Sequence, residues 1–281
     1  MLAEDADEMV RERAENALLS QSPQAFAAAL AGDAPATQLF RYCGKNLLNR
    51  PEIAAALIKN RRCPVEFLTP AAKALPTSAV QEWMQDLDAL STNRPLASAL
   101  MQSPSLTADQ LQQLEELLAD KSAGESAFAE AVADIDASAE QRATLLQRLA
   151  GMRVVERVQL GLKGNREERM ALIRDPCKVV QRAVLQSSRL TDREVETFAA
   201  MASLTDEVLR MIAMNRKFQR NYAVVRNLMN NPKTPLDLTL HMLPAVTAPD
   251  LKKLATNKNI SDPLRTAAMR LQVQRKSRAE G

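Results

Sequence analysis

The chain has 281 residues, enough for one large or two modest domains, with 46% hydrophobic and 25% charged residues and a formal net charge of +3. Only 3% of the residues are aromatic and only 7 are glycine, whereas sheets favour aromatic and β-branched residues and use glycine in hairpin turns. These figures argue against sheet-based folds, and the many Ala, Leu, Met, Gln, Glu and Arg residues predict an all-α protein.

The N-terminal stretch MLAEDADEMVRERAE is acidic and lacks the basic and apolar regions of a signal peptide. Apolar runs such as AFAAALA are far shorter than the roughly 18 residues that a membrane span needs, so no span is expected. The three cysteines, Cys43, Cys63 and Cys177, are odd in number and widely spaced. This pattern predicts reduced thiols in a cytoplasmic protein rather than a disulfide framework.

Short helical segments that end at Asn recur along the chain. VLRMIAMNRK (208–217) and DLKKLATNKN (250–259) superpose without gaps at an offset of 42 residues, and LDALSTNRP (87–95) and QLGLKGNRE (159–167) are looser copies. Asn tolerates the left-handed backbone that finishes many helices and can also bond nearby backbone groups, so each of these Asn residues is expected to end a helix in one of these two ways.

A second and a third helical segment follow most of these Asn residues. The second segment ends in a three-residue pattern: Leu, Ile or Met comes first, any residue follows, and Asn, Ser or Asp comes last. Examples are NRPEIAAALIKN (49–60) and NYAVVRNLMNN (221–231). The third opens with Pro, Thr or Ser followed by an acid, as in CPVEFL (63–68), LTADQL (106–111), LTDREV (190–195), TPLDLT (234–239) and ISDPLR (260–265). Such residues start helices, with Pro expected at the first helical position. Together the segments predict repeating units of about 42–50 residues.

The repeat is interrupted in the middle of the chain. ADKSAGESAFAEAVADIDASAEQRA (119–143) is rich in Ala, Ser and acids and lacks the Asn pattern. We expect an N-terminal helical array over residues 1–120, a divergent repeat or a junction over 121–138, and a C-terminal array with a basic tail over 139–281.

Two segments resemble units of known repeat families. ALIRDPCKVVQRAVLQSSRLTDREVETFA (171–199) resembles a unit of the HEAT, armadillo-like or leucine-rich-repeat-variant kind, with an Asp-Pro, a Val pair, an Arg-Ala-Val run and a Thr-capped helix. NLMNNPKTPLDLTLHML (227–243) resembles the same unit and has the Asn-Pro-x-Thr-Pro spacing typical of the variant repeats. The resemblance covers residues 160–275 and, more loosely, 40–118. It implies a right-handed α-solenoid of short helices and specifies no activity. The cysteine-rich iron–sulfur segment of the leucine-rich-repeat-variant prototype has no equivalent here.

Candidate catalytic and metal-ligating residues are few. His241 is the only histidine, lies between apolar neighbours and is expected to be partly buried or at a packing surface. The cysteines lack the two-residue spacing of a zinc site. Gly161 and Gly164 lie near a lysine but without the spacing or the preceding strand of a phosphate-binding loop. The single Trp83 is expected to pack between helices, with a binding anchor as the alternative. We therefore expect no enzyme, and no metal or cofactor.

The charges are distributed unevenly. Residues 1–140 hold 11 Lys and Arg against 21 Asp and Glu, a net charge of −10, and residues 141–281 hold 26 against 13, a net charge of +13. This indicates two functional halves or an acidic partner for the second half, and the alternative is an ordinary solvated helical surface.

Basic residues recur in three successive segments of the second half, and equivalent positions of a solenoid line one face. Such a face attracts phosphates or acidic segments. The candidate face consists of Arg166, Arg169, Lys178, Arg182, Arg216, Lys217, Arg220, Arg226, Lys252 and Lys253. The resemblance also implies a structural use of arginine, in which an Arg bonds an Asp of a neighbouring unit, and Arg182 with Asp175 is the expected pair.

The repeat pattern and the charge distribution suggest three functions. The first is a non-enzymatic scaffold or adaptor that presents a solenoid face to a protein partner, such as an acidic segment. The second is a nucleic-acid-binding solenoid that uses the basic residues of the C-terminal array. The third, a HEAT-like alkylpurine DNA glycosylase, is disfavoured because the aromatic residues are too few.

Overall fold

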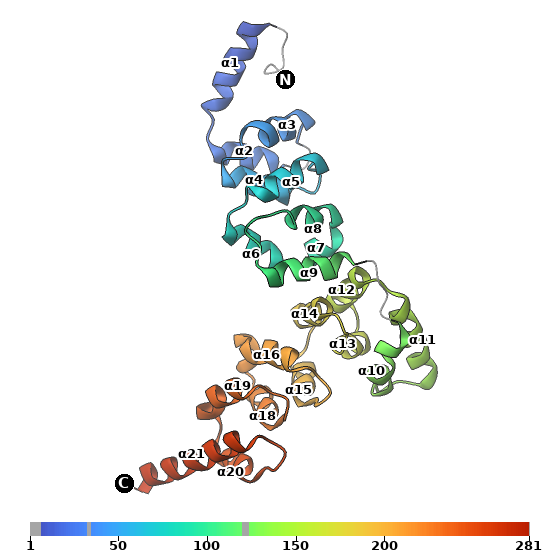
Figure 1. Ribbon diagram of the computed structural model, residues 1–281, viewed down its shortest axis with the longest axis vertical. Coiled ribbons are helices and arrows are strands. Elements are labelled where there is room, and N and C mark those ends of the chain that lie inside the picture. The colour runs from blue at the N-terminus through green and yellow to red at the C-terminus, as the bar shows by residue number, and fades with distance from the viewer. Residues whose placement is uncertain (1–6, 33–34, 120–123, 281) are drawn as a thin grey trace. The chain divides into compact units, whose positions relative to one another are not determined.

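The computed structural model describes residues 7–32, 35–119 and 124–280. It divides into two compact units, Met1–Ala119 (unit 1) and Asp120–Gly281 (unit 2). The described residues form helices and no strand, as the composition predicted (Figure 1). No helix among them combines the length and the apolar character that crossing a membrane requires.

Unit 1 consists of nine described helices. They are α1 (Glu8–Leu19), α2 (Pro23–Leu30), α3 (Thr37–Asn46), α4 (Pro51–Lys59), α5 (Val65–Lys73), α6 (Thr77–Gln85), α7 (Leu87–Thr92), α8 (Arg94–Leu100) and α9 (Ala108–Leu118). Helix α4 packs against α2 and α5, and α5 packs against α8. Their core includes Ile53, Leu57 and Leu100, which are fully buried, and the buried Phe26 and Phe67.

Unit 2 contains the remaining elements. They are η2 (Glu125–Ala127), α10 (Ala129–Ala133), α11 (Ala139–Gly151), α12 (Val154–Lys163), α13 (Arg166–Leu172), α14 (Lys178–Gln186), α15 (Asp192–Ala200), α16 (Asp206–Met214), α17 (Arg216–Gln219), α18 (Tyr222–Asn230), α19 (Leu236–Met242), η3 (Leu243–Ala245), α20 (Ala248–Thr256) and α21 (Asp262–Glu280). The closest pairings are α12 with α14, α15 with α18 and α20 with α21. Of the central segment 121–138, residues 124–138 include η2 and α10, which pack against α11, and residues 121–123 lie outside the described part.

Helix starts follow the expected chemistry, with one difference. The hydroxyls of Thr107 and Thr191 accept the N–H of the third helical residue, and the side chain of that residue bonds back to the cap. Pro64 and Pro235 lie at the N-cap, one residue before the expected first helical position. The extended backbone of an N-cap suits proline, because its fixed φ fits that conformation and no N–H is needed there.

Helix ends follow the second of the two ways expected for Asn. Every described residue other than glycine has a negative φ, so none of the Asn residues adopts the left-handed conformation. Asn60, Asn231 and Asn257 follow their helices with extended backbone, at φ of −83°, −83° and −73°. The side chain, and not the backbone, gives Asn its role at these positions.

Four residues at helix ends each accept one hydrogen bond and donate another through the side chain. We call them the stop residues: Asn60, Ser187, Asn231 and Asn257. Each accepts the N–H of the residue two positions later, closing the turn that leaves the helix. Each also donates to an oxygen 25 to 32 residues earlier in the chain. Asn231, for example, donates its Nδ2 to the carbonyls of Ala199 and Met201, both at 3.0 Å. The stop residues therefore tie each helix end to an earlier part of the same unit.

Candidate partner-binding face

Nine of the ten residues of the candidate face have side chains that reach solvent, and the tenth is buried. Arg182 on α14 is half-buried and the other eight are exposed. Arg169, on α13, is only 4% exposed. A guanidinium buried to this degree is not displayed to a partner, so the expectation that Arg169 belongs to the face is wrong.

Arg169 instead holds two helices together. Its Nε donates to Oε1 of Glu194 on α15 at 2.9 Å, and its Nη2 donates to Oε2 at 3.0 Å. Its Nη1 donates to the carbonyl of Gly164 at 2.7 Å, and the Thr191 hydroxyl donates to Glu194 at 2.7 Å. The buried charges are thus paired and bonded on several sides, which is what such burial requires.

A second buried pair repeats this arrangement one helix earlier. Arg157 on α12 donates its Nε to Oδ2 of Asp175 at 2.8 Å and its Nη1 to the carbonyl of Met152 at 2.7 Å. In both pairs the arginine reaches the carbonyl five residues before itself. Asp175 also accepts the N–H of Cys177. Burial raises the pKa of the Asp175 carboxyl, and the Arg157 guanidinium opposes that rise.

The pairing expected between Arg182 and Asp175 is therefore wrong, because Arg157 occupies both carboxylate oxygens of Asp175. Helix α12 packs against α14, and Arg157 of α12 reaches Asp175 in the connector between α13 and α14. An Arg–carboxylate pair between helices does occur, as the resemblance implied, but it uses a different arginine.

Among the exposed cations, two are engaged by acids of unit 2. Lys178 Nζ lies 2.6 Å from Oε2 of Glu207, and Lys253 Nζ lies 3.4 Å from Oδ1 of Asp250. The hydroxyl of Tyr222 donates to Asp250, and this hydrogen bond is the main reason that the pKa of its carboxyl is lowered. Asp250 therefore stays ionised and interrupts the basic surface at α20.

The remaining cations are concentrated at α17. Arg216, Lys217 and Arg220, which we call the α17 cluster, are all exposed. Asn215 caps this short helix by accepting the N–H of Lys217 at 2.9 Å, and the buried Phe218 anchors it to the core. The three cations therefore lie on a turn that is fixed at its start and in its middle.

Contacts on the C-terminal side of the cluster place it between neighbouring helices. Asn221 donates to Oε1 of Glu196 on α15 at 2.7 Å, and Tyr222 bonds Asp250 on α20 at 2.8 Å. The structure thus brings Arg216, Lys217 and Arg220 together, whereas Arg166 lies on α13 and Lys252 on α20. Arg226 is exposed on the next helix, α18.

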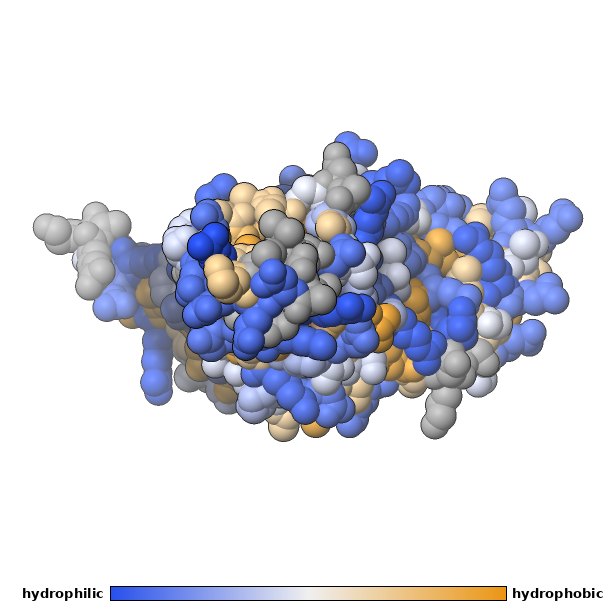
Figure 2. Space-filling model, turned by 90° about the horizontal axis from the view of Figure 1, so that it is seen from above, coloured by the Kyte–Doolittle hydropathy of each residue, from blue (hydrophilic) through white to orange (hydrophobic). Residues whose placement is uncertain are grey.

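Exposed hydrophobic residues are scattered over both units. Figure 2 shows hydrophilic residues over most of the face in view, with hydrophobic residues exposed in separate patches. The exposed large hydrophobic side chains are Met9, Val65, Met214, Leu240, Met269 and Val273. Met214 is 65% exposed and directly precedes the capping residue Asn215, so it lies next to the α17 cluster.

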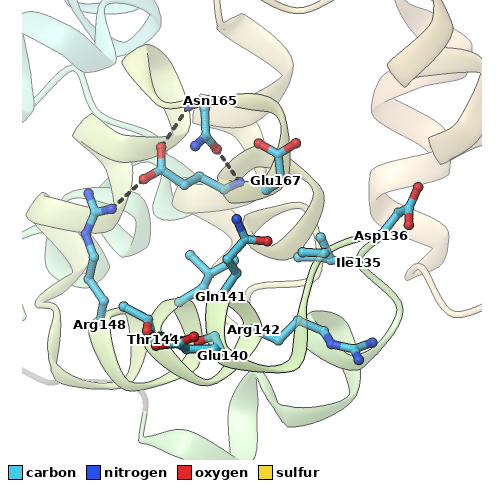
Figure 3. A pocket seen from close by; sticks show the side chains of 12 residues that line it. Ile135, Asp136, Glu140, Gln141, Arg142, Thr144, Arg148, Asn165 and Glu167 are labelled. Carbon is cyan, nitrogen blue, oxygen red and sulfur yellow. Dashed lines mark hydrogen bonds and ion pairs between the residues drawn. The ribbon is translucent and has the colours of Figure 1, made fainter.

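A hollow of ≈ 490 Å³ lies between α11 and α13 and carries mixed charge (Figure 3). Its buried carboxylate, Glu168, accepts from Nη1 of Arg148 at 2.6 Å and from the N–H of Asn165 at 2.7 Å. Asn165 in turn accepts the N–H of Glu168 at 2.8 Å, which caps α13. One oxygen of Glu168 therefore bonds Asn165 at the start of α13, and the other pairs with Arg148 of α11.

The candidate catalytic and metal-ligating residues do not come together in one site. Within the described part of the chain, no three His, Cys, Asp or Glu side chains are grouped so that they could hold a metal ion. His241 is exposed on α19, so its expected burial is wrong; Thr239 and Met242 supply the buried side of that helix. Burial raises the pKa of Cys43 and of Cys63 to about 11, which keeps both as unreactive thiols at neutral pH.

Comparison of the chain with protein-family models, with curated proteins and with solved structures finds no match. The α17 cluster with Met214 combines three exposed cations that form no ion pair with the described residues with an exposed apolar side chain. The three cations belong to the face that the sequence predicts, and Met214 does not. The only feature of the sequence that pointed to Met214 is its position beside the helix-ending Asn215.

Proposed function

We propose that the protein is a non-enzymatic scaffold or adaptor, and that unit 2 binds an acidic segment of a protein partner at the α17 cluster. The main support for this proposal is that three exposed cations lie on one fixed turn beside the exposed Met214. The cations attract a negatively charged segment, and the flexible methionine supplies adaptable apolar contact.

Nucleic acid is the second candidate, because exposed arginine and lysine attract phosphates equally well. Proteins that bind single strands also use exposed aromatic side chains on which bases stack. All three phenylalanines of unit 2, Phe128, Phe198 and Phe218, are buried, and the Tyr222 hydroxyl is bonded to Thr247 and Asp250. This lack of a stacking surface in the described unit favours the acidic protein segment.

We further propose that the short helices of each unit form a right-handed α-solenoid of the HEAT, armadillo-like or leucine-rich-repeat-variant kind. The support is the recurrence of the same stop residues and of the same buried arginine geometry at successive helices. We place the protein in the cytoplasm, a reducing compartment, in keeping with three cysteines that form no disulfide.

The function is tested by reversing the charge of the cluster with Arg216→Glu, Lys217→Glu and Arg220→Glu together. We expect the dissociation constant for a labelled peptide rich in Asp, Glu and Leu to rise at least about tenfold, a loss of about 1.4 kcal/mol. Fluorescence anisotropy measures this for the peptide and, in parallel, for single- and double-stranded DNA at low and moderate salt.

The matched control reverses three other exposed charges of unit 2, in Lys233→Glu, Lys258→Glu and Arg270→Glu. It changes the net charge by the same amount and should weaken peptide binding far less. An equal loss in both variants would show that only net charge matters and would overturn the proposal. Tighter binding of DNA than of the peptide, with a steep salt dependence, would support the second candidate instead.

A further inference from the structure

Unit 1 contains a groove that its core does not fill. The groove has a volume of ≈ 940 Å³ and is lined by residues of α2, α4 and α6. Figure 1 shows these three helices following one another along one side of unit 1. Half-buried small residues from all three helices line it: Ala27, Ala55, Ala56 and Ala79. Side chains this small let another chain approach the helices closely.

The one large aromatic side chain in the groove is Trp83, the only tryptophan of the protein. It is half-buried on α6, a helix that is fixed to the core by the buried Val80 and Met84. Its indole N–H has no hydrogen-bond partner among the described residues, although a packed tryptophan usually has one. Trp83 therefore offers both an apolar surface and a free donor on a firmly held helix.

The charges of the groove are separated between its two sides. Lys59, Arg61 and Arg62, at the end of α4, are exposed, and their side chains form no ion pair or hydrogen bond with the described residues. On the α6 side lie Glu82 and Asp86, and Oδ1 of Asp86 accepts the N–H of Ala89 at 3.0 Å, which caps α7. The groove thus presents three unengaged cations next to an aromatic anchor.

The α4 side of the groove is also held in place. The stop residue Asn60 lies between Lys59 and Arg61, donates to the carbonyl of Leu30 at the end of α2, and accepts the N–H of Arg62 at 2.8 Å. The cations therefore extend from a fixed turn, which lowers the entropic cost of arranging them around a ligand.

We propose that this groove binds a short peptide segment of a partner protein that combines a bulky apolar side chain with neighbouring acidic residues. The apolar side chain packs against Trp83 and the alanine floor, and the acidic residues pair with Lys59, Arg61 and Arg62. Aromatic and arginine residues in such positions commonly dominate the energy of protein interfaces. This site is separate from the α17 cluster and gives each unit its own binding surface.

The intrinsic fluorescence of Trp83 tests the proposal directly in the full chain, because no other tryptophan contributes. Two peptides of equal negative charge are titrated, one with a central leucine and one with serine in its place. We expect the leucine peptide to shift the emission to shorter wavelength, since apolar contact removes water from the indole, and the serine peptide to bind at least about tenfold more weakly.

Four variants extend the test. Arg61→Glu with Arg62→Glu should raise the dissociation constant of the leucine peptide at least about tenfold, and Glu82→Lys should lower it. The matched control is Lys45→Glu with Lys73→Glu, two exposed cations of unit 1 that do not line the groove, and it should change little. The triple reversal at the α17 cluster should leave the Trp83 response intact.

Several outcomes would overturn the proposal. They are an unchanged Trp83 emission with both peptides, an equal shift with the serine peptide, or an equal loss in the matched control. Peptide binding seen by anisotropy but without a change at Trp83, and abolished by the α17 variant, would reject the groove while supporting the function proposed for unit 2.

Discussion

Replacing Arg157 by alanine is expected to lower the free energy of unfolding of unit 2 by about 3–5 kcal/mol, because the fully buried carboxylate of Asp175 then loses its counter-charge. Two guanidinium bonds to Asp175 and one to the Met152 carbonyl disappear together. Urea unfolding followed by circular dichroism measures the difference.

The effect of this substitution should depend on pH. Burial already raises the pKa of Asp175 in the native protein, and removing Arg157 raises it further. When the native pKa lies above the unfolded value, the native state binds more protons, so stability increases as the pH falls through the native pKa. The deficit of Arg157→Ala should therefore be smaller near pH ~5 than near pH ~8. A deficit that is the same at both pH values would contradict this account.

Arg210 provides a matched control, since it also makes two bonds to one aspartate. Its Nη1 lies 2.9 Å from Oδ2 of Asp237, and its Nη2 lies 3.4 Å from Oδ1. Both side chains are exposed, and the hydrogen bond from Arg210 is the main reason that the pKa of Asp237 is lowered. Because water replaces a lost surface partner, Arg210→Ala should leave the unfolding midpoint nearly unchanged. Equal losses in the two variants would show that burial does not decide the effect.

Asn231→Ala should cost about 2–4 kcal/mol, since it removes hydrogen bonds from several backbone groups at once. The carbonyls of Ala199 and Met201 lose their amide donor, and the N–H of Lys233 loses its acceptor. Asn231→Asp keeps the acceptor but places a negative charge beside two carbonyl oxygens, so it should be no better tolerated. Thermal unfolding of both variants measures these losses.

The adjacent Asn230 is the control for this experiment. It is exposed, its Nδ2 bonds the carbonyl of Arg226 within the same helix, and its Oδ1 accepts from Asn257. Asn230→Ala should cost less than about 1 kcal/mol, because water can replace each lost bond. A loss as large as that of Asn231→Ala would mean that the bonds to α15 and its connector are not what stabilises this turn.

The all-helical fold was predictable because propensity and capping are local properties of the sequence. The caps at Thr107 and Thr191 lie within three residues of the N–H groups that they accept. The role of the Asn residues at helix ends was not predictable to the same degree. Their second bond reaches an oxygen about 30 residues away, and which oxygen it meets depends on how the helices pack.

The sequence also did not predict which charged residues of the candidate face are buried. Helix α13 begins with Arg166, Glu167, Glu168 and Arg169, four charged residues in succession that suggest a fully solvated turn. The structure buries Glu168 and Arg169, because each finds an oppositely charged partner on a neighbouring helix. Sequence patterns identify charge, but the partners that Glu168 finds on α11 and Arg169 finds on α15 decide which charges remain available to a ligand.

The short reach of the stop residues also bears on how the molecule responds to mechanical load. Each of their side-chain bonds joins points only 25 to 32 residues apart, so no such bond links the two ends of a unit. In the solenoid that we propose, each helix contacts only its neighbours, so we expect a pull on the end of unit 2 to detach α21 and α20 before it disturbs α12 and α14. On that proposal, we expect unit 2 to lengthen under tension in small steps rather than in one cooperative event.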